Sequence, residues 1–246
     1  MGPSRDAALL TAIAAELQEH PTEDGTVADV LDRAVALLPP ADHASLTVRR
    51  RHVGWDTAGA TSALAVRADE LQYALEEGPC VEAYAAADRR TSDRVADDPR
   101  WPRWGPAADD LGVRSVLSIG LEARGERVGS LNLYAGTPAG FADPAVAELA
   151  RLYAVHASYA LHSAHRREGL ESAIATRHVI GLAQGVLMER FGLDQERSFA
   201  LLQRLSSTHN RKLRDICEEL VRTGDTPGLA AGPDTGPDTG PDTGPD

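Results

Sequence analysis

The sequence predicts an α+β domain, then an all-α domain of three helices, then a disordered tail. In residues 20–162, helical periodicity at both ends surrounds segments with strand-like patterns, which is typical of an α+β domain. Residues 171–224 carry apolar residues at helical spacing, interrupted only by two short breaks. Residues 225–246 form a tail in which Gly-Pro-Asp-Thr repeats from Gly232 to Asp246, a composition that supplies neither a helix nor a buried strand.

Length and composition narrow the class of protein. With 246 residues, 42% of them hydrophobic, the chain has room for one large domain or for two ordinary domains, each long enough to bury a core. No apolar run approaches the roughly 18 residues that a transmembrane helix needs, and residues 1–6 lack the pattern of a signal peptide. Cys80 and Cys217 do not have the spacing of metal ligands. We therefore expect a cytoplasmic protein without membrane contact.

Charge differs between the regions of the chain. The net charge is −12, but residues 166–224 carry ten bases and eight acids, whereas residues 1–165 have a net charge of −9 and residues 225–246 one of −5. An acidic surface repels nucleic acid, so nucleic-acid binding belongs in the net-positive, all-α region. With so small an excess of bases, binding by charge alone is weak.

The elements of the first domain follow from periodicity and from turn residues. A helix is expected at residues 6–18, within an N-terminal segment of residues 1–19. A second helix, residues 26–38, ends at Pro39-Pro40 because proline cannot continue a helix. The remaining expected elements are strands Ala44–Val48 and Gly54–Leu64, a helix near Ala68–Leu75, a proline-rich loop Asp97–Trp104 that leads into a helix, and a hairpin of Val113–Leu121 and Arg127–Ala135 around the turn Glu122–Glu126.

A helical pattern begins at Pro144 and continues through a connector, residues 163–170, into the all-α domain. The polar junction Arg166–Gly169 is the expected flexible point. A sustained coiled coil is not indicated, because polar residues interrupt the heptad pattern. A dimer of paired helices remains possible, and its contact would be the partial apolar stripe Val146, Leu149, Leu152 and Tyr153.

The first helix of the all-α domain has two different faces. Its apolar side, expected in the core, consists of Val179, Ile180, Ala183, Val186, Leu187 and Phe191. The opposite side, here called the glycine face, consists of Ile174, Arg177, Gly181, Gly185 and Met188. A glycine within a helix costs about 0.5–1 kcal/mol relative to alanine. Two of them one turn apart indicate a close approach to the backbone, either by an external partner or by a neighbouring helix of the bundle.

Asp194 and Asn210 are the expected N-caps of the second and third helices, after breaks at Phe191–Asp194 and Ser206–Asn210. The expected core positions are Phe199, Leu201, Leu202 and Leu205 in the second helix and Leu213, Ile216, Cys217, Leu220 and Val221 in the third. The first turn of the third helix carries the bases Arg211, Lys212 and Arg214. They oppose the helix dipole but suit a phosphate ligand. The alternative is a solvated basic patch, partly offset by the acids Asp215, Glu218 and Glu219.

Residues 174–221 resemble the ANTAR domain, an RNA-binding module of bacterial transcription antiterminators. The matching residues are Arg177, Ile180, Ala183, Gly185, Leu187, Met188, Phe199-Ala200, Leu205-Ser206 and Asn210-Arg211-Lys212-Leu213. The resemblance implies binding to a pair of RNA stem-loops in a nascent transcript, which stops a terminator from forming. We expect RNA contacts at Arg177, Gly181, Gly185, Met188, Ser206, Asn210, Arg211 and Lys212. The chain departs from the family at Gln184, where lysine is common, and at Ser198 and Cys217, where alanine is usual.

Residues 20–162 resemble a GAF domain of the kind that is fused to ANTAR domains in bacteria. The matching segments are Gln72-Tyr73, Glu77–Cys80, Asp97–Trp104 and Gly129–Tyr134. The resemblance implies an antiparallel sheet flanked by helices, which senses a small ligand or the redox state, or serves in dimerisation. The candidate sensor residues are Cys80, Trp101 and Trp104. Cys80 is either a reactive thiol or a buried structural residue, and the tryptophans either line a ligand pocket or complete the core.

The motifs of common catalytic sites are missing from the sequence: it holds no Gly-rich phosphate loop, zinc motif or nucleophile elbow. His162 and His165 lie at i and i+3 without a further metal ligand. We expect no catalysis and no metal, and the cofactor is unknown. The prediction is a signal-responsive, RNA-binding transcription antitermination regulator that acts as a homodimer and receives an unknown small-molecule or protein signal. The alternatives are a DNA-binding three-helix regulator and a ligand-binding dimerisation protein without nucleic-acid binding.

Overall fold

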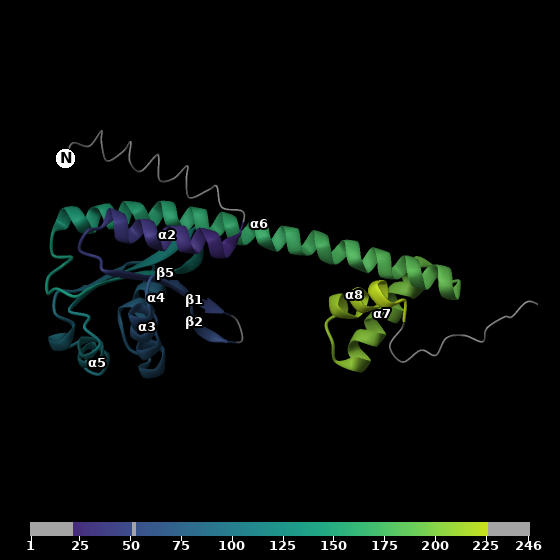
Figure 1. Ribbon diagram of the computed structural model, residues 1–246, viewed down its shortest axis with the longest axis horizontal. Helices are drawn as coiled ribbons and strands as arrows, with labels where there is room; N and C mark the ends of the chain where they lie inside the picture. The colour runs from purple at the N-terminus through teal and green to yellow at the C-terminus, as the bar shows by residue number, and fades with distance from the viewer. Residues whose placement is uncertain (1–21, 51–52, 226–246) are drawn as a thin grey trace, which may run out of the picture. The chain divides into compact units, whose positions relative to one another are not determined.

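The computed structural model describes residues 22–50 and 53–225 (Figure 1). The chain divides into two compact units, Met1–Gly169 and Leu170–Asp246. The helix expected at residues 6–18 and the tail from residue 226 onward, with its repeat, lie outside the described residues. In the described ranges, no helix is both long and apolar enough to cross a membrane.

The first unit contains a five-stranded sheet in the order β2-β1-β5-β4-β3, with every neighbouring pair antiparallel. The strands are β1 His43–Arg50, β2 Gly54–Ala60, β3 Arg89–Ser92, β4 Ser115–Ala123 and β5 Glu126–Ala135. The predicted hairpin is confirmed as β4–β5, which turns at Arg124 and Gly125, both with positive φ. Positive φ at both turn residues matches the twist of the flanking strands. The four-residue strand β3 is absent from the sequence-based prediction.

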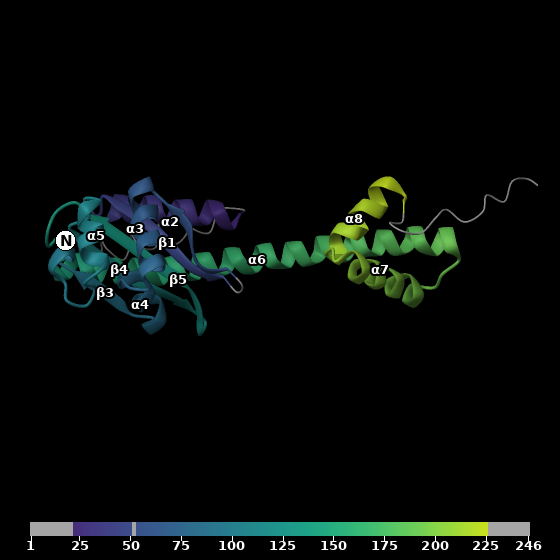
Figure 2. The ribbon, with the colours of Figure 1, turned by 90° about the horizontal axis from the view of Figure 1, so that it is seen from below.

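One face of the sheet packs on two helices, α2 Glu23–Leu37 and the N-terminal part of α6 Pro144–Phe191 (Figures 1 and 2). The side chain of Thr22 caps α2 by accepting from the Gly25 N–H. The apolar side chains between helices and sheet include Val30, Leu31, Leu46, Leu117, Leu131, Leu133, Tyr153 and Leu161. The hydroxyl of Tyr153 donates to the carbonyl of Val30 at 2.6 Å, which joins α6 to α2.

This packing corrects the predicted dimer stripe. Tyr153 is fully buried, and Val146 and Leu149 pack against the same core. Three of the four stripe residues are therefore used inside the unit, because they lie on the face of α6 that covers the sheet. The exposed apolar residues of this part of α6 are Val155, 45% exposed, and Tyr159, 48% exposed.

The other face of the sheet carries α3 Ala63–Leu75, α4 Pro79–Ala86 and α5 Trp104–Asp110, with a 3-10 turn at Val95–Asp97 (Figures 1 and 2). The helix α3 begins at Ala63, so strand β2 is shorter than predicted. The helix α4 is not predicted from sequence. It lies close to β4: a Cβ added at Gly120 would be 2.3 Å from the carbonyl oxygen of Ala83.

The second unit packs the C-terminal part of α6 with α7 Gln195–His209 and α8 Leu213–Thr223. Asp194 caps α7 as predicted, accepting from the Arg197 N–H at 2.8 Å. The buried core consists of Ala183, Leu187, Leu202, Leu205, Ile216, Cys217 and Leu220, which confirms the predicted apolar faces at these positions. Val221 is 38% exposed rather than buried, and Phe199 is half-buried. Arg166–Gly169, the expected flexible point, has helical backbone within α6.

Two predicted boundaries in the second unit are wrong. The segment Ser206–His209 continues α7 instead of breaking it. Asn210 is the C-cap of α7, in the left-handed conformation with φ 49°, and the N-cap of α8 is Lys212. Asparagine is a good N-cap but also tolerates left-handed φ, so its presence does not distinguish a helix start from a helix end.

Candidate functional site

The glycine face is solvent-exposed in the second unit. A Cβ added at Gly181 or at Gly185 would meet nothing within 4 Å. Arg177 is exposed, and Ile174 and Met188 are 67% and 38% exposed. The alternative of a tight helix–helix contact inside the bundle is therefore wrong, because no helix of the described unit approaches these glycines.

The turn between α7 and α8 is held by Ser206. Its hydroxyl donates to the carbonyl of Arg211 at 2.6 Å, and its own carbonyl accepts from the Arg211 N–H at 3.1 Å. Asn210 and Lys212 on either side of Arg211 are exposed. Ser206 thus fixes the backbone of the basic turn, and its hydroxyl proton is already used inside the unit.

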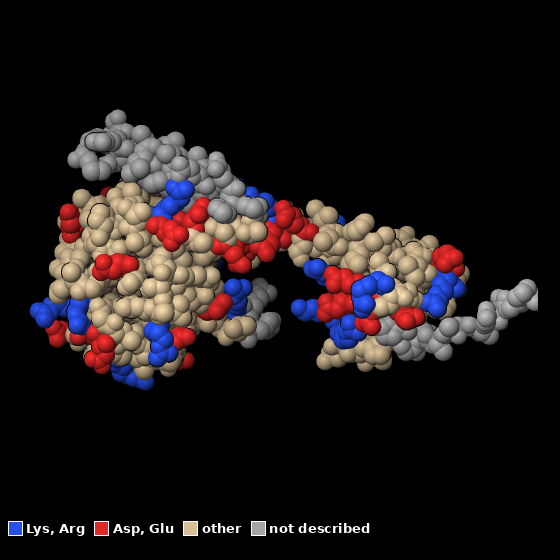
Figure 3. Space-filling model, in the orientation of Figure 1, with Lys and Arg blue, Asp and Glu red and all other residues tan. Residues whose placement is uncertain are grey.

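Acidic side chains offset part of the positive charge at this turn. Arg211 forms an ion pair with Glu219 at 2.5 Å, and Arg214 forms one with Glu218 at 2.6 Å. All four side chains are at least one-third exposed, so solvent weakens both pairs. Lys212 has no ion pair with another described residue. Figure 3 shows acidic and basic side chains next to one another on the visible face of this unit.

The family departure at Gln184 has a structural counterpart at Ser198. Gln184 Nε2 donates to the carbonyl of Gln195 at 2.9 Å and to Ser198 Oγ at 3.4 Å. Ser198 is fully buried and also donates to the Gln195 carbonyl, at 2.9 Å. The side chain of Gln184 in α6 therefore forms hydrogen bonds with the first turn of α7. Where lysine could reach outward to a phosphate, this glutamine is engaged within the bundle.

In the first unit, the three candidate sensor residues are all fully buried. Trp101 and Trp104 meet edge to face with ring centroids 5.7 Å apart, and their indole N–H groups donate to Glu82 and to the Ala68 carbonyl. Both rings belong to the apolar cluster that α3 and α5 form above the sheet. This favours the interpretation that the two tryptophans complete the core and do not line a ligand pocket.

Cys80 lies at the start of α4, with its backbone N–H bonded to Gln72 Oε1 at 2.8 Å. Burial, and then the nearby Asp69, raise the pKa of its thiol well above the ordinary value. The thiolate is the reactive form of cysteine. The geometry therefore favours the structural alternative for Cys80.

A buried polar network that is not predicted from sequence occupies the space beneath α3. It consists of Asp69, Gln72 and Tyr73 of α3 together with Thr47, Thr57, Asn132 and Tyr134 of the sheet. Asp69 is fully buried and accepts from Tyr134 Oη at 2.5 Å, Thr57 Oγ1 at 3.0 Å and Asn132 Nδ2 at 3.3 Å. Each of these three donors is electrically neutral. Burial of Asp69 without a cationic partner raises the pKa of its carboxyl to about 6.

The sequence does contain a signal for this network. Thr47 in β1 and Ser130, Asn132 and Tyr134 in β5 alternate with apolar residues of the same strands, such as Leu46 and Leu131. Alternation of period two places them all on one face. What the sequence does not show is that α3 covers this face, because that contact joins residues far apart in the chain.

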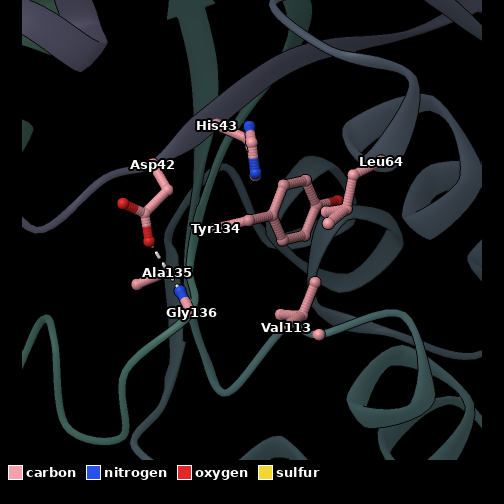
Figure 4. A pocket seen from close by; sticks show the side chains of 8 residues that line it. Asp42, His43, Leu64, Val113, Tyr134, Ala135 and Gly136 are labelled. Atoms are coloured by element: carbon pink, nitrogen blue, oxygen red, sulfur yellow. Dashed lines mark hydrogen bonds between the residues drawn. The ribbon is translucent and has the colours of Figure 1, made fainter.

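A pocket opens beside the network at one end of the sheet (Figure 4). Its volume is about 320 Å³, and its lining residues are Asp42, His43, Leu64, Gly112, Val113, Tyr134, Ala135 and Gly136. Figure 4 shows the ring of Tyr134 among the side chains of His43, Leu64 and Val113, and Asp42 turned toward the backbone of Gly136. None of the three candidate sensor residues, Cys80, Trp101 and Trp104, lines this pocket.

The two histidines of the connector region pair with different carboxylates. His162 Nδ1 lies 3.6 Å from Glu126, and His165 Nδ1 lies 2.9 Å from Glu23. The described residues contain no group of three or more His, Cys, Asp or Glu placed to hold a metal ion.

Comparison with solved structures places the fold among known proteins. A bacteriophytochrome from the photosynthetic bacterium R. palustris superposes with a TM-score of 0.58 at 11% identity, covering 82% of this chain and 47% of that one. The GAF domain of an Acinetobacter phosphoenolpyruvate-protein phosphotransferase has a TM-score of 0.53 at 12% identity, covering 69% and 99%. Free methionine-R-sulfoxide reductase from Neisseria meningitidis, in complex with its substrate, has a TM-score of 0.50 at 14% identity, covering 64% and 88%. This chain spans about half the length of the bacteriophytochrome, and identities this low show the fold alone.

Comparison with protein families is more specific. No curated protein matches the chain. Residues 20–162 match the GAF domain and residues 168–221 match the ANTAR domain. The sheet flanked by helices and the helices that follow it are the folds expected of these two domains. The chain belongs to the GAF domain family, and its GAF domain is followed by an ANTAR domain.

Proposed function

We propose that this protein is an RNA-binding transcription antitermination regulator whose ANTAR domain binds stem-loop RNA under the control of a small-molecule signal at its GAF domain. The match to both families supports a sensor joined to an antitermination regulator. The observation that carries the RNA-binding step is the exposed glycine face of α6, with Gly181 and Gly185 open to an approaching molecule.

The glycine face offers what an unpaired RNA base needs. Gly181 and Gly185 bring the helix backbone to the surface, and Arg177 adds a cation that can hold a phosphate or stack on a base. Met188 supplies an apolar, adaptable contact for a base face. Loops and other unpaired regions are the usual targets of sequence-specific RNA recognition, because their bases are free to leave the stack.

The α7–α8 turn supplies a second, less specific contact. Lys212 is exposed, and α8 begins without a side-chain cap, so the N–H groups of its first turn remain available to a phosphate. Ser206 keeps this turn in place through its two hydrogen bonds to Arg211. We infer that Asn210, Arg211 and Lys212 contact the RNA backbone and contribute affinity rather than sequence preference.

Substitution of Gly185 tests the proposal. Gly185→Leu places a bulky side chain on the glycine face, at a position where an added Cβ would meet nothing within 4 Å, so the domain should fold. We expect this variant to lose most of its preference for a two-hairpin RNA over a loop-scrambled RNA, a change of tenfold or more, about 1.4 kcal/mol. Gly169→Leu is the matched control, because Gly169 is also open and lies in the same helix outside the glycine face.

Binding titrations with both RNAs and a DNA duplex of the same sequence give the readout, with circular dichroism to check the helices. A folded Gly185→Leu protein that still discriminates the two RNAs would contradict the RNA interface placed here. Tighter binding to the DNA duplex would favour the alternative of a DNA-binding regulator. In contrast, Lys212→Ala should weaken both RNAs equally and reduce the salt dependence of binding by a slope of about one.

We also propose that the protein acts as a homodimer, since the target is expected to present two hairpins. Val155 and Tyr159 are large apolar side chains on α6 that remain about half exposed in the GAF unit. Light scattering on wild type and on Tyr159→Glu, with and without RNA, tests this. Monomers of the wild type under both conditions would contradict it.

A further inference from the structure

Two aromatic rings and two arginines meet at one end of the GAF sheet. Trp55 of β2 and Tyr84 of α4 pack edge to face, with ring centroids 5.1 Å apart. The guanidinium of Arg49, the residue opposite Trp55 in β1, lies 5.4 Å from the Trp55 ring centre. That of Arg127, near the start of β5, lies 5.8 Å from the Tyr84 ring centre. Both distances are within the range of cation–π attraction, and we call these four residues the Arg–aromatic cluster.

The two arginines of the cluster are open to an external partner. Arg49 and Arg127 are exposed, and the two rings are half-buried. Neither arginine forms an ion pair or a side-chain hydrogen bond with another described residue, whereas the adjacent Arg50 is paired with Asp56 at 2.6 Å. A guanidinium carries its five N–H donors along its edge, so stacking on a ring leaves them available. The cluster therefore presents donors that suit an anionic acceptor from outside.

The surroundings of the cluster are basic, although the first 165 residues are acidic overall. Residues 49–56 and 122–127, which span the two turns at this end of the sheet, contain five arginines and three acids, a net charge of +2. None of these three acids forms an ion pair with Arg49 or Arg127. A local excess of bases attracts anions even where the net charge of the protein is negative.

The chemistry of the cluster fits unpaired RNA better than an acidic peptide. An exposed guanidinium held on an aromatic ring can bind a phosphate through its N–H edge and stack its outer face on a base. An acidic peptide would use the N–H edge alone. Sites for single-stranded nucleic acid commonly combine basic, aromatic and arginine stacking contacts. We propose that the Arg–aromatic cluster binds an unpaired stretch of RNA, in addition to the contacts of the ANTAR domain. The inference rests on the proposed function, because it takes RNA as the partner, and it extends RNA binding to the GAF domain.

Tryptophan fluorescence of the full-length chain tests the proposal. Of its three tryptophans, Trp101 and Trp104 are fully buried and Trp55 is half-buried, so a ligand at the cluster should change the emission of Trp55. The probe is an oligouridine of about ten nucleotides, a length within the range that single-strand sites cover, and it forms no hairpin. We expect a saturable change in emission at low salt. Oligouridine that does not bind, or that binds without changing the emission, would overturn the proposal.

Arginine variants locate the binding on the cluster. Arg49→Gln and Arg127→Gln should each weaken oligouridine binding about three- to tenfold and reduce its salt dependence by a slope of about 0.7. Arg89→Gln is the matched control, because Arg89 is exposed, lies in the edge strand β3 and has no ion pair with a described residue. Its loss should change the affinity by less than about twofold. Equal losses in all three variants would mean that net charge alone governs binding, which would overturn the assignment to the cluster.

Two further arms separate this inference from its alternatives. A polyglutamate peptide of similar charge should bind at least about tenfold more weakly than oligouridine. Equal binding would assign the surface to an acidic protein segment and overturn the choice of RNA. Gly185→Leu, which tests the ANTAR interface, should show the same change in Trp55 emission as the wild type. Loss of two-hairpin preference with this emission change intact would affect the proposed function alone, and the opposite result would affect the cluster alone.

Discussion

Gly120 of the GAF domain and two glycines of the ANTAR domain have opposite surroundings. A Cβ added at Gly120 of the GAF domain would lie 2.3 Å from the carbonyl oxygen of Ala83, because α4 packs directly on β4. A Cβ added at Gly181 or Gly185 of the ANTAR domain would meet nothing within 4 Å. The first glycine is required by internal packing. The other two weaken their helix and meet no other described part of the chain, which supports the proposed contact with RNA.

The largest expected effect comes from the crowded glycine. Gly120→Ala forces α4 away from the sheet, since a backbone carbonyl cannot yield as the end of a flexible side chain can. We expect a loss of about 3 kcal/mol in the free energy of unfolding, measured by urea denaturation. A loss below about 0.5 kcal/mol would remove the contrast between the two domains.

Charged groups of the two domains also differ in their burial. Asp69 of the GAF domain is fully buried among neutral partners, whereas Arg211 and Glu219 of the ANTAR domain form a pair at the surface. A buried carboxylate without a cation destabilises the folded state, and an exposed pair contributes little. Titration of Asp69 should therefore change the free energy of unfolding, whereas removal of the Arg211–Glu219 pair should change RNA binding.

The second prediction concerns the pH dependence that Asp69 confers. In the unfolded chain its carboxyl has a pKa of 3.8, and in the folded chain burial raises the pKa to about 6. Between these values the folded protein keeps a proton that the unfolded chain has lost, so the free energy of unfolding falls as pH rises. The fall amounts to at most about 3 kcal/mol for a shift of about two pKa units, and it ends above pH 6.

Comparison with Asp69→Asn isolates this effect from that of the other acids. Denaturation of both proteins between pH 4 and pH 7.5 should show a wild-type stability that declines relative to the variant across the window from 3.8 to about 6. A constant difference between the two proteins over this range would show that Asp69 is ionised throughout.

Sequence patterns predicted the long elements and missed those that depend on distant residues. The apolar periodicity of α6, α7 and α8 and the β4–β5 hairpin are local features, and the structure confirms them. The strand β3 has only four residues and α4 only eight, too few for a periodic pattern to stand out. The boundaries near Asn210 failed because asparagine suits a helix start and a helix end alike.

The candidate sites likewise divide into features that local sequence predicts and features that join distant residues. The exposure of Arg177, Gly185 and Met188 follows from helical spacing, which is local. The pocket beside Tyr134 and the network around Asp69 join β1, β5 and α3, whose order in space the sequence does not show. The chemistry of Cys80, Trp101 and Trp104 makes them candidate sensor residues in the sequence, but burial decides whether a reactive side chain can meet a ligand.

The third prediction tests the exposed glycines directly. Gly181→Ala adds a methyl group where nothing lies within 4 Å, so the higher helix propensity of alanine alone should change the stability. We expect the free energy of unfolding to increase by about 0.5–1 kcal/mol, in contrast to the loss at Gly120. A decrease, measured under the same conditions, would mean that the glycine face does contact another part of the protein.

The smallest effect on stability, and the sharpest test of the exposed charges, comes from Glu219→Gln. This change releases Arg211 from its surface ion pair, and because both side chains are more than one-third exposed, stability should change by less than about 0.5 kcal/mol. If Arg211 contacts RNA phosphate, the released guanidinium should raise RNA affinity and steepen its salt dependence. Glu218→Gln is the matched control: it removes one negative charge from the same helix but releases Arg214, which is outside the proposed contacts. Salt-dependent titrations should show a larger gain for Glu219→Gln than for Glu218→Gln. Equal gains would mean that net charge, and not the position of Arg211, governs binding at this turn.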